Sequence, residues 1–346
     1  GFVRANGILL VPLLAFFLMH GWWRKHGRDP EELSIAPQYE PPAGLTPGEL
    51  GMLVDNKADM RDVTATIVDL AVRGFLVIED EEESHIFGLV KSRTYAFELV
   101  RAQAEWTGLR PHEVGLLHAL FDDGARTRVS IEELENSFYQ DLPDIKKRLT
   151  ESLIEHGFCS KRPDKVIGKY VLIGVLAGLI VGVGGVVWLI RLGESPLPAA
   201  IAAFLTVAVM IGFALVMPAR TVRGARMREH ALGFGEFLQR VEQDRFDRVV
   251  KTPEMFEKYL PYAMAFGTEK NWARAFDDIY REPPDWYRGY HGTQFFAHGL
   301  ATNLSSMASS TSNAMASAPR SSSGSSGFGG GGFSGGGFGG GGGGGF

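Results

Sequence analysis

Three long apolar segments dominate the hydrophobic pattern of this chain. Residues 7–23, 170–190 and 197–217 contain no Asp, Glu, Lys or Arg. As helices, they would extend about 26 Å for the first and about 31 Å for the other two, enough to cross the hydrocarbon core of a bilayer. The pattern predicts a transmembrane helix within residues 1–24 and a transmembrane helical hairpin at residues 170–217, with the connection "RLGESP".

A cleaved signal peptide is the alternative for the first segment. Such a peptide carries its positive charge before the apolar run and small residues after it. Here Arg24, Lys25 and Arg28 follow the run, which favours a membrane span. Transport paths usually need ionised groups at depth. Because the three segments have none, the sequence argues against a transport path built from this chain alone.

Glycines recur at a regular interval in the second apolar segment. Gly174, Gly178 and Gly182 are four residues apart and would share one helical face. Small residues let two membrane helices approach closely. We therefore expect these glycines to mediate transmembrane helix packing, although glycine is also common in membrane helices without this role.

Between the first two spans, the pattern predicts helices followed by strands. Thr46 and Glu49 form a capping box before a short helix. An apolar stripe of helical spacing follows at residues 63–71, Gly74 ends that helix, and "FLVIED" is typical of a strand. We expect the acidic run at residues 79–83 to be a solvated turn between strands.

The same order of elements returns further along the chain. A helix opens at Pro111, Ser130 and Glu133 form a second capping box, and Gly157 precedes "FCS". Helix, helix, glycine and strand hairpin resemble a winged helix. The sequence thus predicts that residues 46–162 form a tandem winged-helix-like domain, with a generic α+β domain as the alternative.

After the third span, residues 218–290 are predicted to form a helical region. Thr252 caps a helix that Pro261 should interrupt. Aromatic and apolar residues here are expected to pack against the other globular segment, with a ligand groove as the alternative. These candidates for interdomain packing are Tyr259, Leu260, Pro261, Tyr262 and Trp272.

Residues 291–346 are of low complexity, first Ala- and Ser-rich and then Gly- and Phe-rich, with 16 of the 44 glycines in residues 321–346. Such a composition buries too little apolar surface to offset its ordering entropy. We expect a disordered tail that is dispensable for folding. The whole pattern describes an α+β membrane protein with three transmembrane helices, a tandem winged-helix-like cytoplasmic domain, a helical C-terminal cytoplasmic region and a disordered Gly-rich tail.

Positive charge is distributed unevenly around the spans. Basic residues cluster after the first span, before the second and after the third, whereas the opposite ends carry only Arg4 and Arg191. Lys and Arg concentrate on the cytoplasmic side of spans. We therefore expect residues 24–169, beginning with a Pro-rich linker at 25–45, and residues 218–346 to be cytoplasmic, and the N-terminus to be extracytoplasmic.

Net charge bears on the kind of partner. The whole chain has a formal charge of −5, and residues 40–160 hold 23 Asp and Glu against 12 Lys and Arg. In the expected recognition helix at residues 60–73, two arginines are offset by two aspartates. Because neutralised phosphates supply most affinity for nucleic acids, we expect no nucleic-acid partner. We expect the lipid bilayer and proteins as partners instead. The sequence leaves open whether the protein forms a homo-oligomer.

Few residues are candidates for catalysis or metal binding. His112, Glu113 and His118 invite a zinc interpretation, but a metalloprotease helix needs its histidines four positions apart and these are six apart. We expect His112 and Glu113 to lie on a helix surface. Cys159, the single cysteine, has only His156 near it in sequence and is expected to be a buried structural thiol. The sequence predicts no catalytic, cofactor-binding or metal site, and we expect no enzymatic activity.

Several motifs together resemble one bacterial family. "GRDP" after the first span, "PQYEPPAGLTPGELG", "IVDLAVRGFLVI", "LPYAMAFG" with a later tryptophan, and the Gly-Phe tail are similar to the predicted membrane proteins called domain of unknown function 2207. The resemblance covers nearly the whole chain. It implies a multi-pass protein of the bacterial plasma (inner) membrane, with an extracytoplasmic β domain before the first span and no established catalytic residue.

Two interpretations of function remain open. The first is a membrane-anchored protein-interaction or signalling scaffold, which couples an external domain to cytoplasmic modules. The second is an enzyme or transporter accessory subunit with a ligand groove between its cytoplasmic domains. Stable protein partners would favour the first, and a bound small molecule would favour the second.

Overall fold

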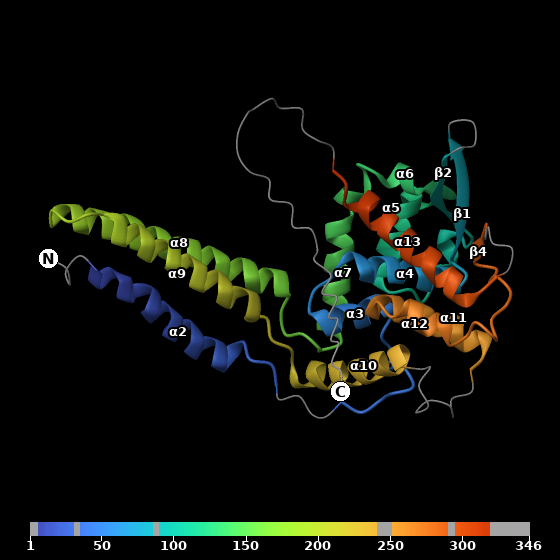
Figure 1. Cartoon of the computed structure of the whole chain (residues 1–346), viewed down its shortest axis with the longest axis horizontal. Coiled ribbons are helices and arrows are strands. Elements are labelled where there is room, and N and C mark those ends of the chain that lie inside the picture. The colour runs from blue at the N-terminus through green and yellow to red at the C-terminus, as the bar shows by residue number, and fades with distance from the viewer. Residues whose placement is uncertain (1–5, 31–34, 86–89, 241–250, 290–294, 319–346) are drawn as a thin grey trace, which may run out of the picture.

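The computed structural model describes residues 6–30, 35–85, 90–240, 251–289 and 295–318, and the side chains of these residues outside 82–92. Figure 1 shows two parts. Three long helices lie side by side as a rod, and the other elements form a globular part at one end of it.

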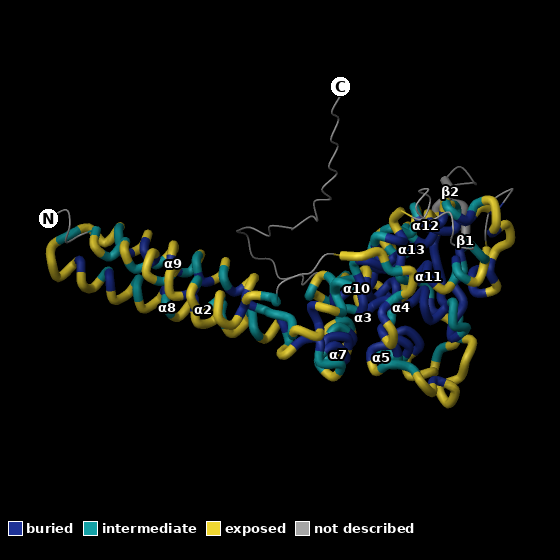
Figure 2. Tube along the Cα trace, turned by 90° about the horizontal axis from the view of Figure 1, so that it is seen from below, coloured by how far each residue is buried: buried dark blue, intermediate teal, exposed yellow. Residues whose placement is uncertain are grey.

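The rod contains the three predicted spans. They are α2 Leu10–His26, which continues the 3-10 turn η1 Gly7–Leu9, α8 Pro163–Arg191 and α9 Leu197–Val216. All three are long and apolar enough to cross a membrane, which confirms three candidate spans by length and composition. The rod is largely exposed (Figure 2), and its exposed side chains include Leu176, Ile180 and Phe204. An apolar surface of this extent suits lipid rather than water.

Helix α9 packs against both α8 and α2. The three predicted packing glycines of α8 lie close to α9. A Cβ added at Gly174 would lie 2.6 Å from the Cβ of Met210, and one added at Gly178 would lie 2.2 Å from Cγ2 of Val207. At Gly182 the nearest side-chain atom would be 3.3 Å away. Hydrogen is therefore the only side chain that fits at the two tightest positions without a shift of α9.

The globular part begins with two helices and a strand hairpin. They are α3 Pro47–Asp55, α4 Met60–Val72, β1 Leu76–His85 and β2 Val90–Leu99. The predicted capping box opens α3, because the Thr46 N–H donates to Glu49 Oε2 at 2.8 Å. The two strands are antiparallel, with Leu76 opposite Leu99.

The acidic run at residues 79–83 lies within β1, so our prediction of a solvated turn is wrong. Pairing with β2 continues through the whole run. Asp80 is 2% exposed and accepts a hydrogen bond from the Tyr287 hydroxyl at 2.7 Å. Charge alone suggested exposure, but the alternation of side chains along a strand turns this carboxylate towards the core.

The second predicted unit forms only in part. Its elements are η2 Gln103–Glu105, α5 Pro111–Phe121, η3 Asp122–Gly124, β3 Arg128–Ser130, α6 Ile131–Leu134, η4 Phe138–Gln140 and α7 Leu142–Glu155. The second capping box, formed by Ser130 and Glu133, is present at α6. Strand β3 pairs with β2, which gives one four-stranded sheet of order β3-β2-β1-β4.

The strand hairpin that we predicted after Gly157 does not form in this described stretch. Cys159 makes a single bridge with Arg220, and α8 already begins at Pro163. The chain must enter the membrane helix at this point, so it has no residues left for a second strand pair. The described residues therefore do not confirm two complete winged helices in tandem.

The C-terminal elements complete the same globular part. They are α10 Val222–Arg240, α11 Pro253–Phe266, α12 Glu269–Arg274, β4 Tyr287–Arg288 and α13 Ala297–Ala316. Strand β4 joins the sheet parallel to β1. Pro261 does not interrupt α11 as predicted. A proline removes one helical hydrogen bond, and the burial of Leu260, Ala263 and Met264 around it holds the helix together.

Helix α13 corrects the prediction that residues 291–346 form a disordered tail. Leu300, Leu304, Met307 and Met315 are fully buried on one face of this helix. The small residues between these side chains give the segment its low-complexity composition. For this reason the apolar stripe was not recognised in the sequence. The Gly- and Phe-rich residues 319–346 lie outside the described residues.

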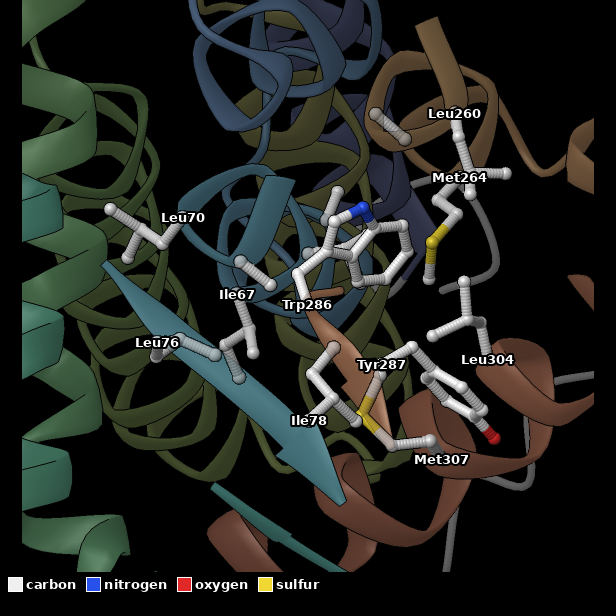
Figure 3. Packing of buried hydrophobic residues seen from close by; sticks show 14 of the residues in the cluster. Ile67, Leu70, Leu76, Ile78, Leu260, Met264, Trp286, Tyr287, Leu304 and Met307 are labelled. Carbon is white, nitrogen blue, oxygen red and sulfur yellow. The ribbon is translucent and has the colours of Figure 1, made fainter. Parts of the chain in front are cut away.

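A large hydrophobic core takes side chains from elements on both sides of the membrane hairpin, and a smaller cluster lies between α3 and α7. Every residue of α4 from Asp62 to Ala71 is buried, and α4 contacts α3, α11 and α13. Figure 3 shows side chains of α4, β1, α11 and α13 gathered around Trp286 and Tyr287. The segments before and after the membrane hairpin thus contribute to the same large core.

Candidate functional site

Two features of the globular part contain polar side chains that the fold brings together. One is a set of hydrogen-bonded polar side chains that joins α3, α4, α5 and α7, here called the buried polar cluster. The other is an open groove beside α4 and β1. The buried polar cluster consists of Thr46, Glu49, Asp69, Arg73, His112, Glu113 and Ser152.

Glu49 anchors the cluster on α3. The capping box turns its carboxylate back towards the Thr46 N–H. The Ser152 hydroxyl of α7 donates to Oε1, and Nε of Arg110 lies 3.9 Å from the same oxygen. The carboxylate is fully buried, so these donors replace the water that it has lost.

His112 of α5 is the least satisfied member. Its Nε2 lies 3.3 Å from the Thr46 hydroxyl oxygen, whereas its buried Nδ1 has no hydrogen-bond partner among the described atoms. Burial lowers the pKa of His112, although the carboxylates of Glu49 and Glu113 oppose this effect. The imidazole is therefore neutral at pH 7.

Arg73 closes the cluster at the end of α4. Its Nη1 lies 2.8 Å from Oδ2 of Asp69 and 2.6 Å from Oε1 of Glu113. Glu113 Oε2 also accepts from the Arg110 N–H at 2.7 Å. Burial raises the pKa of Asp69 to about 6, although the Arg73 guanidinium opposes the rise. One arginine thus ties the end of α4 to the start of α5.

The contacts of this arrangement hold helices together. The Ser152 hydroxyl is engaged as a donor to Glu49, which joins α7 to α3. Within the described part of the chain, no group of three or more His, Cys, Asp or Glu residues could hold a metal ion. The prediction that His112 and Glu113 lie on a helix surface is wrong, since they are 1% and 0% exposed. Both find polar partners inside the fold, which their sequence spacing alone did not reveal.

The open groove lies beside the end of α4 and the start of β1, with a volume of about 770 Å³. Its second wall is the segment at residues 279–288, which leads from α12 to β4. Apolar residues line the groove on both walls. They are Val72, Leu76, Val77, Val100, Ile279, Pro283 and Pro284.

Glu257 of α11 holds the second wall of the groove in place. Its Oε1 accepts from the Tyr280 hydroxyl and its Oε2 from Nε1 of Trp286, both at 2.8 Å. Burial raises the pKa of Tyr280, and the neighbouring carboxylate adds to the rise, so the phenol keeps its proton and donates. Sequence reasoning missed Glu257, because its partners lie 23 and 29 positions away.

The structure places the five residues proposed for interdomain packing in the core, and none of them lines the groove. Leu260, Pro261 and Trp272 are buried, and the ring of Tyr259 lies 5.9 Å from that of Trp272. Tyr262 donates to the Leu45 carbonyl at 2.9 Å, which links α11 to the residues before α3.

Comparison with known proteins identifies a family but no characterised relative. Residues 36–276 match a family model described as a predicted membrane protein (DUF2207) C-terminal domain. No curated protein and no solved structure matches the chain. The matched residues include the buried polar cluster and the membrane hairpin, but not α13. The chain therefore belongs to this family of predicted membrane proteins of unknown function.

Proposed function

We propose that this protein is a membrane-anchored protein-interaction or signalling scaffold of the bacterial inner membrane. Its globular part lies in the cytoplasm and its N-terminal end lies outside. The open groove is the observation that carries the proposal, because it offers an accessible apolar surface next to the core.

The groove suits an extended, apolar segment of a protein partner that carries a basic residue. Val100 is 54% exposed and Ile279 is 42% exposed, so both are available for hydrophobic contact. Of the two arginines in the lining, Arg288 is engaged by Glu98 and Glu79. The carboxylates in the lining are Glu257, Glu282 and Asp285. This acidic excess complements a basic side chain.

Protein is a better candidate partner than nucleic acid. A recognition helix must enter the major groove of DNA, and therefore has to be exposed. Helix α4, which occupies that place in the sequence, is buried by α3, α11 and α13. Its Arg73 is engaged by Asp69 and Glu113. The excess of acidic residues between positions 40 and 160 adds repulsion from phosphate.

Binding is also favoured over chemistry in the groove. Among the carboxylates that line the groove, Glu257 accepts a hydrogen bond on each of its oxygens, from Tyr280 and from Trp286. A general base needs a lone pair aimed at its substrate. An enzyme or transporter accessory role is therefore the weaker interpretation of this surface.

The cytoplasmic orientation rests on charge. The basic clusters after α2, before α8 and after α9 all belong to the ends of the spans that adjoin the globular part (Figure 1). Lys and Arg at such ends mark the cytoplasmic side of a membrane. This distribution supports a globular part that faces the cytoplasm.

Site-specific photocrosslinking in intact cells tests the proposal. A photoreactive residue at Val100 of the full-length protein should crosslink to one discrete protein, and Ile279→Glu should abolish that product. The matched control is the same photoreactive residue at Gln140, which is exposed and lies outside the groove. Identical products from both positions, or a product that survives Ile279→Glu, would refute a groove-mediated contact.

A further inference from the structure

A smaller cavity lies where the three spans meet the globular part, and is here called the interfacial cavity. Its volume is about 260 Å³. Residues from the end of α2, the start of α8 and the chain after α9 surround it. The lining residues are Trp22, His26, Ser160, Lys161, Val166, Lys169, Tyr170, Met217, Pro218 and Ala219.

The charge of the interfacial cavity is positive. Lys161 and Lys169 line it, and no carboxylate does. Neither lysine makes an ion pair with the residues that the structure describes. Two arginines near the cavity are engaged, Arg162 with Asp164 at 2.6 Å and Arg220 with Asp29 at 2.8 Å. Lys161 and Lys169 are thus the Lys and Arg side chains that the lining itself offers to a ligand.

Aromatic residues set the depth of the interfacial cavity. Nε1 of Trp22 donates to the Tyr170 hydroxyl at 2.8 Å, which joins α2 to α8. The ring of His26 stacks on that of Trp22 with centroids 4.3 Å apart. Trp and Tyr concentrate at the headgroup level of a bilayer. The cavity therefore lies at the depth of lipid phosphates.

The surface next to the cavity is apolar on its membrane side. Leu18, one turn before Trp22 on α2, and Ile173, one turn after Tyr170 on α8, are both exposed. A ligand with a phosphate in the cavity would thus have hydrocarbon-like surface beneath it. This combination matches an amphiphile rather than a free anion.

We propose that the interfacial cavity binds the headgroup phosphate of an anionic phospholipid. Lys161 and Lys169 pair with the phosphate, and the acyl chains lie along the exposed apolar faces of α2 and α8. Basic pockets between membrane helices favour such headgroups. The cavity also touches two of the three connections between the rod and the globular part, the one before α8 and the one after α9. A bound lipid would therefore fix the globular part relative to the membrane surface.

The experiment uses the full-length protein in zwitterionic detergent–phosphatidylcholine micelles, titrated with phosphatidylglycerol. The measured quantity is the rise in melting temperature. Lys161→Gln/Lys169→Gln should raise the lipid concentration for half-maximal stabilisation by roughly tenfold or more, as expected for two lost basic contacts. The unliganded melting temperature of each variant checks that it is folded.

The matched control is Arg24→Gln/Lys25→Gln, which removes two exposed positive charges at a similar depth but outside the cavity. It should shift the titration far less than the double lysine variant. Equal shifts would mean general surface attraction and would overturn the site. Equal stabilisation by inorganic phosphate at the same concentration would overturn the lipid assignment.

Discussion

At the scale of single residues, Arg73 is notable because it is the cation of two ion pairs in the globular part. It pairs with Asp69 and Glu113, whose side chains are 12% and 1% exposed. Buried carboxylates lose hydration, and their partners have to replace it. The pKa of Asp69 is raised because burial disfavours the charged carboxylate more than the neighbouring Arg73 stabilises it.

Arg73→Met should therefore destabilise the protein strongly. Two carboxylates would remain buried without their cation, a situation that typically costs about 3–5 kcal/mol of unfolding free energy. The melting temperature of the detergent-solubilised protein measures the effect. Arg148→Met is the matched control, because its partner Asp144 is half exposed and such surface pairs contribute less than about 1 kcal/mol. Similar losses in both variants would contradict the importance of the buried polar cluster.

The residues that sequence reasoning placed correctly are those whose partners are local. Thr46 and Glu49 satisfy each other within one turn, so their capping box was readable from the sequence. His112 was wrongly predicted to lie on a helix surface, and Glu257 was missed. In both cases the partners come from distant elements. Their burial depends on the packing of whole helices, which no local pattern encodes.

At the scale of elements, α13 shows the limit of composition as a guide. Ala and Ser make up much of this helix, yet its large side chains form one buried stripe. Small residues let a helix lie close to its neighbours, here α12, α4 and α6. An apolar face with few large side chains can therefore still complete a core.

Removal of α13 should prevent stable folding of the globular part. Deletion of residues 297–346 exposes the surface that this helix covers, and Leu304→Ala alone should cost about 2–5 kcal/mol. Deletion of residues 319–346 is the control, and the Gly- and Phe-rich composition of this segment predicts an unchanged melting temperature. The prediction fails if the longer deletion melts at the same temperature as the shorter one.

At the scale of the whole molecule, the three spans followed from the sequence because length and apolarity alone define them. Packing between the segments before and after the hairpin was also expected, but their union in one core was not, since the chain leaves the globular part at residue 160 and returns to it at residue 220. A sequence interrupted by two membrane helices suggested two separate domains. Long-range contacts made by α11 and α13 with α4 join them.

Cysteine accessibility tests the orientation of the whole molecule. In a Cys159→Ala background, Ser195→Cys in the connection between α8 and α9 should react with an impermeant thiol reagent in intact cells. Gln140→Cys in the globular part should react only after the membrane is permeabilised. The reverse pattern would place the globular part outside.

The insertion of a membrane hairpin into a globular core has a consequence for biosynthesis. Helix α4 leaves the ribosome early, but α11 and α13, which cover it, come after α8 and α9. At roughly 5–20 residues per second, the apolar side chains of α4 wait on the order of tens of seconds for these partners. The hairpin is synthesised before the last core helix, so it is available for membrane insertion while the core is still incomplete. Completion of the globular core therefore follows the synthesis of the hairpin.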